Sequence, residues 1–469
     1  MEKRIKKELI FSKVINRISF MGKKQTTVSR RTFLSGAAVA GASGALGVAG
    51  YRKFSGTQGA RIKESLVSHM EGLTIIDAHE HMWSEEESLA DGGWDIVGAL
   101  LTQYTPTAFN SAGMEKKRDW LNDKNVPLDE KWNVLRPYLP YVAQTGYFST
   151  ANMAVQALYG IKRLDESNFY EVNELIKNDL KPGYYDKILK DHCKIERVLN
   201  QRPWGKNEGY DDFVTDISRE TQELQYALNS GYDHLRGLWG KYGEPGMNLD
   251  EFAEKWIGSL SGKHHGVKIQ SGVPFPKPSF EEAQTQLEKY LKDRSDGDRN
   301  TICLYLLHKA IELCGKYNLI VAVHCGIIYE CWRDFYGTSV KNIVQAAMKY
   351  RDTTFDLYHA SIPWVREAGV AGNQYPNVNL NLTWTHEISP AMTISFLNEW
   401  LDLVPLNKII GFGADGKSPF LTAGVRRRTF DNIAEVLSHR VKGGGMNLEE
   451  AEEICRMWLY DNPKRIYAL

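Results

Sequence analysis

The sequence Ile75-Ile76-Asp77-Ala78-His79-Glu80-His81 is a short apolar run that ends in two histidines one residue apart. Side chains alternate faces along a β-strand, so residues two apart point to the same side. His79 and His81 are therefore expected side by side at the end of a strand, where both imidazoles can bind one metal ion. Two polar residues where a strand meets water would give the same short pattern, so the rest of the chain must decide.

The second half of the chain alternates helix-like and strand-like segments, which is typical of βαβ units and a parallel sheet. Strands are predicted at residues 74–79, 195–199, 266–270, 319–324, 354–359, 377–384 and 408–413. Helices are predicted at residues 301–316, 340–350, 363–374, 391–403, 425–441 and 448–459.

These elements predict an α/β fold, a TIM-type (β/α)8 barrel that spans residues 70–469. Seven of the eight strands are visible, and the second is expected within residues 85–190. That stretch is rich in Trp, Tyr, Pro and Asn and is predicted to be a large insertion after the first strand. Such loops lie over the site of barrel enzymes and select the substrate.

The composition excludes several kinds of partner and covalent link. The chain has 58 Lys plus Arg and 58 Asp plus Glu, so no net field attracts nucleic acid or an acidic membrane. A small-molecule substrate is the predicted partner, and a homo-oligomer stays open. The 6 cysteines form no Cys-x-x-Cys pair, and several lie in apolar patterns, so buried free thiols are predicted.

Residues 1–50 are predicted to be an export signal and not part of the fold. Ser29-Arg30-Arg31-Thr32-Phe33-Leu34 precedes a mildly apolar run that is rich in Ala and Gly, a pattern that resembles a twin-arginine signal. The run is short for a membrane span, which needs about 20 strongly apolar residues. A periplasmic or extracellular location is expected, with an uncleaved anchor and a basic tail as the alternatives.

Ligand-type side chains fall at the ends of the predicted strands, which form the catalytic face of an α/β barrel. His324 and His359 each end a strand, Asp415 follows the last strand, and Lys268 lies near the end of the strand at 266–270. Each has a plain structural alternative, such as a core histidine, an Asp-Gly turn or a salt-bridged lysine. Their shared position at strand tips favours one common site.

In this order of residues the chain resembles the amidohydrolase superfamily of metal-dependent barrels, from about Leu73 to the C-terminus. The pattern of that superfamily is Asp-x-His-x-His on the first strand, His on the fifth, His on the sixth and Asp on the eighth. The matching positions are Asp77-Ala78-His79-Glu80-His81, His324, His359 and Asp415. The ending Asn462-Pro463-Lys464-Arg465-Ile466-Tyr467 is also similar, with Asn462 starting a last helical turn beside the barrel.

The resemblance implies a role for each matched residue. His79, His81 and His324 would bind a divalent ion, with zinc expected and manganese as the alternative. Zinc lowers the pKa of bound water to near 7 and so supplies hydroxide at neutral pH. Asp415 would bind the metal or act as the general base, and His359 would orient the water or polarise a substrate carbonyl.

The roles of two further residues, Lys268 and Arg333, stay open. In the binuclear branch of the superfamily a carboxylated lysine on the fourth strand bridges two metals, and Lys268 sits on the strand counted as fourth. The mononuclear branch, which includes aminocarboxymuconate semialdehyde decarboxylase, uses no bridging lysine, and a substrate carboxylate or phosphate is a third partner for Lys268. Arg333 lies beside Trp332 and Tyr336 in a loop that could cover the site, where its planar fork would suit a carboxylated substrate.

The expected function is an exported metal-dependent hydrolase of the amidohydrolase superfamily that cleaves an amide, ester or lactone. A non-oxidative decarboxylase and a uronate-isomerase-like enzyme on the same metal site are the alternatives within enzymes. A barrel that captures a ligand without turnover is the alternative outside them, although a pure binder has no need of Asp415.

Overall fold

The computed structural model describes residues 58–201, 213–230, 233–293 and 297–469, so the predicted export segment lies outside the described residues. The chain divides into residues 1–60 and a compact unit, Arg61–Leu469. Within the described residues, no helix combines the length and the apolar character that a membrane span requires.

Eight parallel strands form one sheet in which the spatial order follows the chain order, β1 to β8. The strands are β1 Ile75–Glu80, β2 Ile195–Asn200, β3 Val214–Ser218, β4 Gly266–Gln270, β5 Ile320–His324, β6 Phe355–Leu357, β7 Val378–Asn381 and β8 Ile409–Ile410. Val, Ile and Leu dominate their buried positions, as expected for parallel strands covered on both faces.

The sheet closes where the segment after β8 meets β1. Ala78 N donates to Phe412 O at 3.2 Å, and Asp415 N donates to His79 O at 2.8 Å. A Cβ at Gly413 would collide with Thr383 Oγ1 and lie 3.1 Å from the backbone nitrogen of His79, so glycine is needed for this close approach. The predicted (β/α)8 barrel is confirmed.

The placement of the missing strand within residues 85–190 was wrong. The strand predicted at 195–199 is β2, and the missing strand is β3, Val214–Ser218, which comes after it. The sequence of β3 is Val-Thr-Asp-Ile-Ser, which is short and half polar, and it pairs with β2 at only three positions. Such a strand gives no apolar run, because it depends on its neighbours for burial and not on its own composition.

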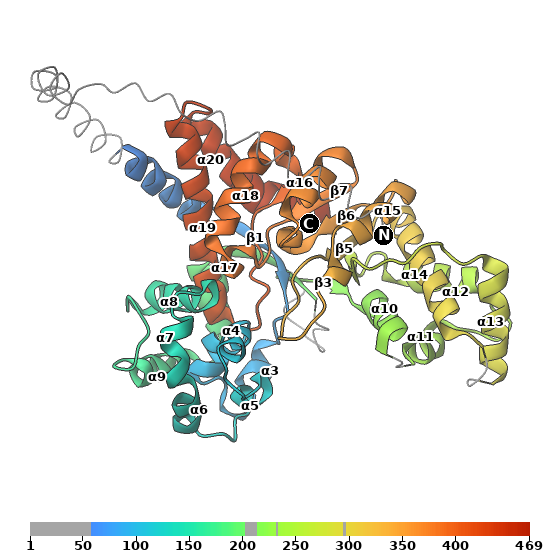
Figure 1. Ribbon diagram of the computed structural model, residues 1–469, viewed down its shortest axis with the longest axis horizontal. Coiled ribbons are helices and arrows are strands. Elements are labelled where there is room, and N and C mark those ends of the chain that lie inside the picture. The colour runs from blue at the N-terminus through green and yellow to red at the C-terminus, as the bar shows by residue number, and fades with distance from the viewer. Residues whose placement is uncertain (1–57, 202–212, 231–232, 294–296) are drawn as a thin grey trace, which may run out of the picture. The chain divides into compact units, whose positions relative to one another are not determined.

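The chain between β1 and β2 is helical and gathers beside the barrel (Figure 1). Its α-helices are α3 Glu85–Leu89, α4 Thr105–Ser111, α5 Arg118–Asn122, α6 Leu128–Leu135, α7 Leu139–Val142, α8 Gly146–Tyr159 and α9 Phe169–Asp179. The longest of them, α8, packs along α19, the helix Pro419–Lys442. The insertion is thereby fixed to the barrel.

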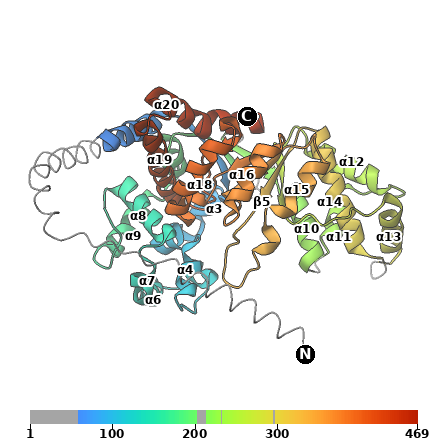
Figure 2. The ribbon, with the colours of Figure 1, turned by 45° about the horizontal axis from the view of Figure 1, so that its top comes forward.

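The helices between β3 and β5 gather on another side of the sheet in both views (Figures 1 and 2). These are α10 Glu220–Ser230, α11 His234–Tyr242, α12 Leu249–Leu260, α13 Phe280–Lys292 and α14 Arg299–Lys316. The later helices are α15 Lys341–Lys349, α16 Val365–Gln374, α17 Thr385–Ile388, α18 Pro390–Leu403, α19 Pro419–Lys442, α20 Leu448–Arg456 and α21 Asn462–Tyr467. Short π and 3-10 helices are η1 Ala90–Gly92, η2 Val97–Leu101, η3 Arg136–Tyr138, η4 Asp186–His192, η5 Tyr336–Thr338, η6 Tyr358–Ser361, η7 Leu406–Lys408 and η8 Met457–Asp461.

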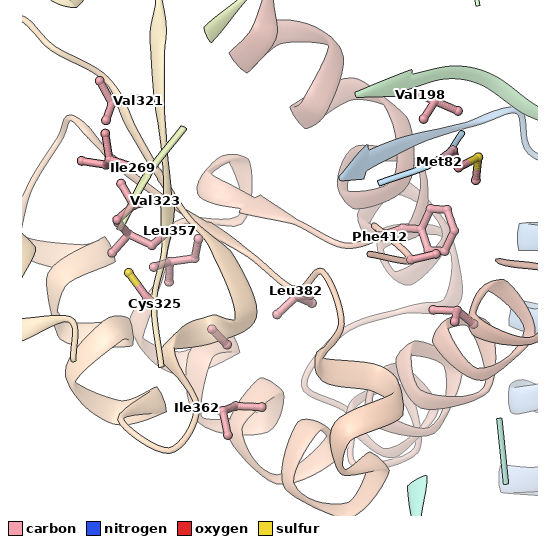
Figure 3. Close-up of a cluster of buried hydrophobic side chains, with 14 of the residues drawn as sticks. Met82, Val198, Ile269, Val321, Val323, Cys325, Leu357, Ile362, Leu382 and Phe412 are labelled. Atoms are coloured by element: carbon pink, nitrogen blue, oxygen red, sulfur yellow. The ribbon is translucent and has the colours of Figure 1, made fainter. Parts of the chain in front are cut away.

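The six helices predicted in the second half are confirmed to within a few residues, apart from an earlier start for α19. Asn462 starts the last helix, as the resemblance implied, and its amide donates to Ile409 O at 2.7 Å. Apolar side chains from neighbouring strands meet in the core shown in Figure 3, which includes Val321, Val323 and Leu357. All six cysteines are free and five are buried, so the prediction of free thiols is confirmed.

Candidate metal centre

Two histidines, His79 at the end of β1 and His81 just after it, converge on one carboxylate oxygen. Nε2 of His79 lies 3.1 Å from Oδ1 of Asp415, and Nε2 of His81 lies 3.4 Å from the same atom. In a tetrahedral site with metal–ligand bonds of about 2.1 Å, ligand atoms lie roughly 3.4 Å from one another. Two imidazole nitrogens and a carboxylate oxygen at this spacing therefore fit a divalent ion, whose identity the donor set leaves open.

His359 brings a further nitrogen to the same carboxylate. Its Nδ1 lies 3.8 Å from Oδ2 of Asp415, and one ligand atom each from His79, His359 and Asp415 fall within 4.8 Å of one another. His359, Ala360 and Ser361 all have left-handed backbone angles, with φ between 48° and 63°. Non-glycine residues persist in this conformation only where the surroundings enforce it, often at functional sites.

Burial keeps the histidines neutral. It lowers the pKa of His79, His81 and His359 well below the usual value, and it lowers the pKa of His324 to about 4. The positive charges of nearby groups, Lys268 among them, act in the same direction on each ring. A neutral imidazole has a free lone pair, which is the form that binds a metal.

His324 and His359 form a hydrogen-bonded pair with too few protons for its contacts. His324 Nε2 lies 3.0 Å from Ile327 O, His324 Nδ1 lies 3.0 Å from His359 Nε2, and His359 Nδ1 lies 3.2 Å from Thr383 O. Each contact needs one proton, while two neutral imidazoles have two. With both outer nitrogens donating to carbonyl oxygens, the contact between the two rings has no proton, so the pair can take up one proton there.

The position of Asp415 is set by its backbone conformation and by hydrogen bonds to its carbonyl oxygen. Its left-handed angle, φ 54°, turns the chain after β8. Its carbonyl accepts one hydrogen bond from Gln103 Nε2 at 2.5 Å and another from the Tyr104 hydroxyl at 2.9 Å. Both donors come from the insertion, so this part of the chain orients the carboxylate without touching it.

Below the centre lies a pair of buried carboxyl groups, Asp77 and Glu80, that are hydrogen-bonded to each other. Burial raises the pKa of Asp77 to about 7 and the pKa of Glu80 well above its usual value. Glu80 also accepts hydrogen bonds from Gly416 N and the Thr422 hydroxyl, and Asp77 accepts one from His79 N at 3.2 Å. Through Ala414 N and Gly416 N, which donate to Asp77 and Glu80, the two carboxyl groups tie β1 to the loop that carries Asp415.

Lys268 is buried on β4 and faces the barrel interior. Its Nζ has no hydrogen-bond partner among the described residues and lies 4.0 Å from the centre of the Tyr358 ring. Burial lowers the pKa of Lys268 to about 7. An amine that is partly neutral at physiological pH can react with carbon dioxide, so it suits carboxylation, whereas binding a substrate carboxylate or phosphate requires its protonated form.

The predicted substrate loop does not meet the centre. Arg333 is exposed and paired with Glu330 at 2.8 Å, and Trp332 is fully exposed. No contact in the described part of the chain joins Arg333 to the histidines or to Asp415. Arg333, Trp332 and Tyr336 are thus exposed residues in the structure.

Sequence reasoning did not find Glu80, Gln103 or Tyr104. Glu80 lies inside the decisive motif, and its place between two ligands on a buried strand was an available signal. Gln103 and Tyr104 are more than 300 positions from Asp415, and no local pattern marks them.

Known proteins resemble the chain in fold and, at low identity, in sequence. No protein-family model matches the chain. A uronate isomerase of Thermotoga neapolitana is 20% identical over 86% of this chain and 96% of its own. The fluG protein of Emericella nidulans is 32% identical over 126 residues, which are 26% of this chain and only 14% of that protein.

Solved structures extend the likeness over most of the chain. Uronate isomerase from Thermotoga maritima has a TM-score of 0.69 at 17% identity, covering 87% of this chain and 97% of that one. Glucuronate isomerase from Caulobacter crescentus has a TM-score of 0.68 at 15% identity, covering 87% and 94%. A proposed metal-dependent hydrolase from Lactobacillus casei has a TM-score of 0.57 at 14% identity, covering 86% and 97%.

The chain therefore has the fold of the amidohydrolase-like TIM barrels. Within that class it has the uronate isomerase fold.

Proposed function

We propose that this chain is a metal-dependent isomerase that interconverts the aldo and keto forms of a sugar acid of the uronate class. The observation that carries the proposal is the convergence of His79, His81 and Asp415 in a chain similar to uronate isomerases over nearly its whole length. The likeness favours isomerisation over the hydrolysis expected from the sequence.

The reaction moves hydrogen within one molecule and needs no oxidant. The proton on C2 leaves, C1 gains a proton, and the proton on O2 is replaced by one on O1. A divalent ion held by His79, His81 and Asp415 would polarise the carbonyl and stabilise the negative charge that develops on its oxygen. Asp415 would accept and return a proton, a role supported by its burial and by the hydrogen bonds that hold its backbone carbonyl.

The histidine pair suits the proton traffic that isomerisation requires. Protons must leave one carbon or oxygen and arrive at its neighbour, and the His324–His359 pair can take up one proton between its two rings. His359 and Asp415 are buried, while His81 and His324 are only partly buried, so protons on the site can exchange with solvent between turnovers.

Hydrolysis of an amide, ester or lactone is the second candidate. The likeness to a proposed metal-dependent hydrolase favours it, and Asp415 could take a proton from water as well as from carbon. Export by the twin-arginine route stays a proposal that rests on residues 29–34.

The test is turnover by purified, metal-loaded protein. D-glucuronate and D-galacturonate in deuterium oxide should give ketose products with deuterium bound to C1, as measured by proton NMR. Deuterium at C1 reports proton transfer through the protein and its solvent. Metal-loaded protein that forms no ketose, yet hydrolyses members of an amide, ester and lactone panel, would overturn the isomerase in favour of the hydrolase.

A further inference from the structure

A cavity of about 530 Å³ lies mostly within the insertion, and Gln103 separates it from Asp415. Gln103 forms part of its wall and also donates to the Asp415 carbonyl at 2.5 Å. Lys417, two residues after Asp415, lines it as well, and the Lys417 backbone N–H donates to Gln103 Oε1 at 2.9 Å. The cavity thus begins one side chain away from the metal-binding residue.

The cavity is larger than one sugar ring requires. Pockets of about 300–1,000 Å³ hold drug-sized ligands. Two half-buried indoles, Trp83 and Trp94, line this cavity together with small residues such as Gly98. Indole rings offer broad apolar faces with a polar N–H at the edge, which suits a ring that carries both C–H and hydroxyl groups.

The charged side chains of the wall are three carboxylates and four cations, namely Glu87, Asp95, Asp119, Arg118, Lys124, Lys131 and Lys417. Lys131 and Asp95 form a pair at 2.7 Å that neutralises both, and the Glu87 carboxylate caps the start of α3 through Ser84. Arg118 has no acidic partner among the described residues, and its guanidinium lies over the Tyr329 ring, 4.5 Å from the centre. A stacked guanidinium with free donors is well suited to bind a carboxylate.

We propose that this cavity binds a second sugar acid ring, so that the substrate is a uronic acid longer than a monosaccharide. This inference rests on the proposed function: the reducing end reaches the metal centre and isomerises, while the linkage to the next ring stays intact. The second ring stacks on Trp94, and its carboxylate pairs with Arg118.

The experiment compares D-galacturonate with α-1,4-digalacturonate on metal-loaded protein. We expect kcat/KM of the wild type to be about tenfold higher for the dimer, the effect of one added charged hydrogen bond. Trp94→Ala and Arg118→Met should each reduce that preference about tenfold, mainly through KM for the dimer. Trp332→Ala, which removes a fully exposed indole outside this cavity, is the matched control and should keep the wild-type preference.

The outcomes separate this inference from the proposed function. If neither compound is isomerised, the proposed isomerase function is rejected. Calorimetric titration of digalacturonate into metal-loaded wild type and both variants then tests whether the cavity binds the dimer. Binding that weakens in both variants supports the cavity site. Wild type without preference for the dimer, or variants that keep it, overturns the inference. Melting temperatures establish that each variant is folded. If Trp94→Ala does not fold, Arg118→Met still tests the inference.

Discussion

The two walls of the metal centre are built in different ways. On the barrel wall, His79, His81 and Asp415 come from adjacent strands, and backbone hydrogen bonds between β1 and the segment after β8 set their spacing. On the insertion wall, Gln103 and Tyr104 reach only the Asp415 carbonyl. The barrel thus supplies the groups for the chemistry, while the insertion orients Asp415 and encloses the space for substrate.

Removing the barrel wall's nitrogen ligands should have the largest effect. The double variant His79→Ala, His81→Ala keeps only the carboxylate of the three converging groups, so we expect bound metal to fall from about one equivalent per chain to none. Turnover should fall at least about 10⁴-fold, because no ion remains to polarise the carbonyl. Elemental analysis of protein purified without chelators measures the metal.

His439→Ala, on the exposed end of α19, is the control and should keep both metal and activity. A double variant that retains one equivalent would show that the metal lies elsewhere. Two equivalents in the wild type would instead favour Lys268 as a carboxylated bridging ligand.

Asp415→Asn should come next in size. The amide keeps the shape of the side chain but cannot take up a proton, and general acid–base groups contribute about 10²–10⁴-fold to rates. We expect kcat to fall in that range while the affinity for D-glucuronate, measured by calorimetry, changes little. Asp402→Asn, in an exposed pair with Arg440, is the control. Lost affinity in a protein that never shows turnover would support the binding-protein alternative.

The two walls differ in how far the sequence alone could predict their residues. The barrel wall could be predicted because its polar residues lie at or just after the ends of strands. β5, Ile-Val-Ala-Val-His, is an apolar run that is expected to be buried, so its polar tip marks the catalytic face. The positions of His79, His81, His324, His359 and Asp415 were therefore predicted to meet.

The residues of the insertion wall could not be predicted from the sequence, for a physical reason. The contacts of Gln103 and Tyr104 with Asp415 depend on how the insertion helices pack, and packing partners across such a separation leave no periodic trace in sequence. The same holds for β3, whose burial is provided by its neighbours.

Lys268→Met tests the barrel interior through stability. The folded pKa of Lys268 is about 7, against a usual value of 10.5, so the unfolded chain binds more protons between these values. Stability is therefore lost as pH falls from about 10.5 to 7 and is constant below, since both states are then protonated. In metal-free protein we expect Lys268→Met to remove this loss and raise the melting temperature most near pH 6–7.

Thermal unfolding at several pH values measures this effect. Lys292→Met, on the exposed end of α13, is the control and should follow the wild type. A variant with the pH dependence of the wild type would show that Lys268 is protonated, or modified, in the fold.

Tyr104→Phe should have the smallest effect, because it acts on the insertion wall and through the backbone. It deletes the hydroxyl that donates to Asp415 O at 2.9 Å and keeps the ring, 4.2 Å from that of Trp384. Gln103 still holds the same carbonyl, so we expect kcat to fall only about three- to tenfold, the value of one neutral hydrogen bond. Tyr147→Phe is the matched control, since Tyr147 belongs to the same aromatic group but makes no hydrogen bond to Asp415. Equal losses in both variants would assign the effect to the aromatic group, and a loss as large as that of Asp415→Asn would mean that the insertion takes part in the chemistry.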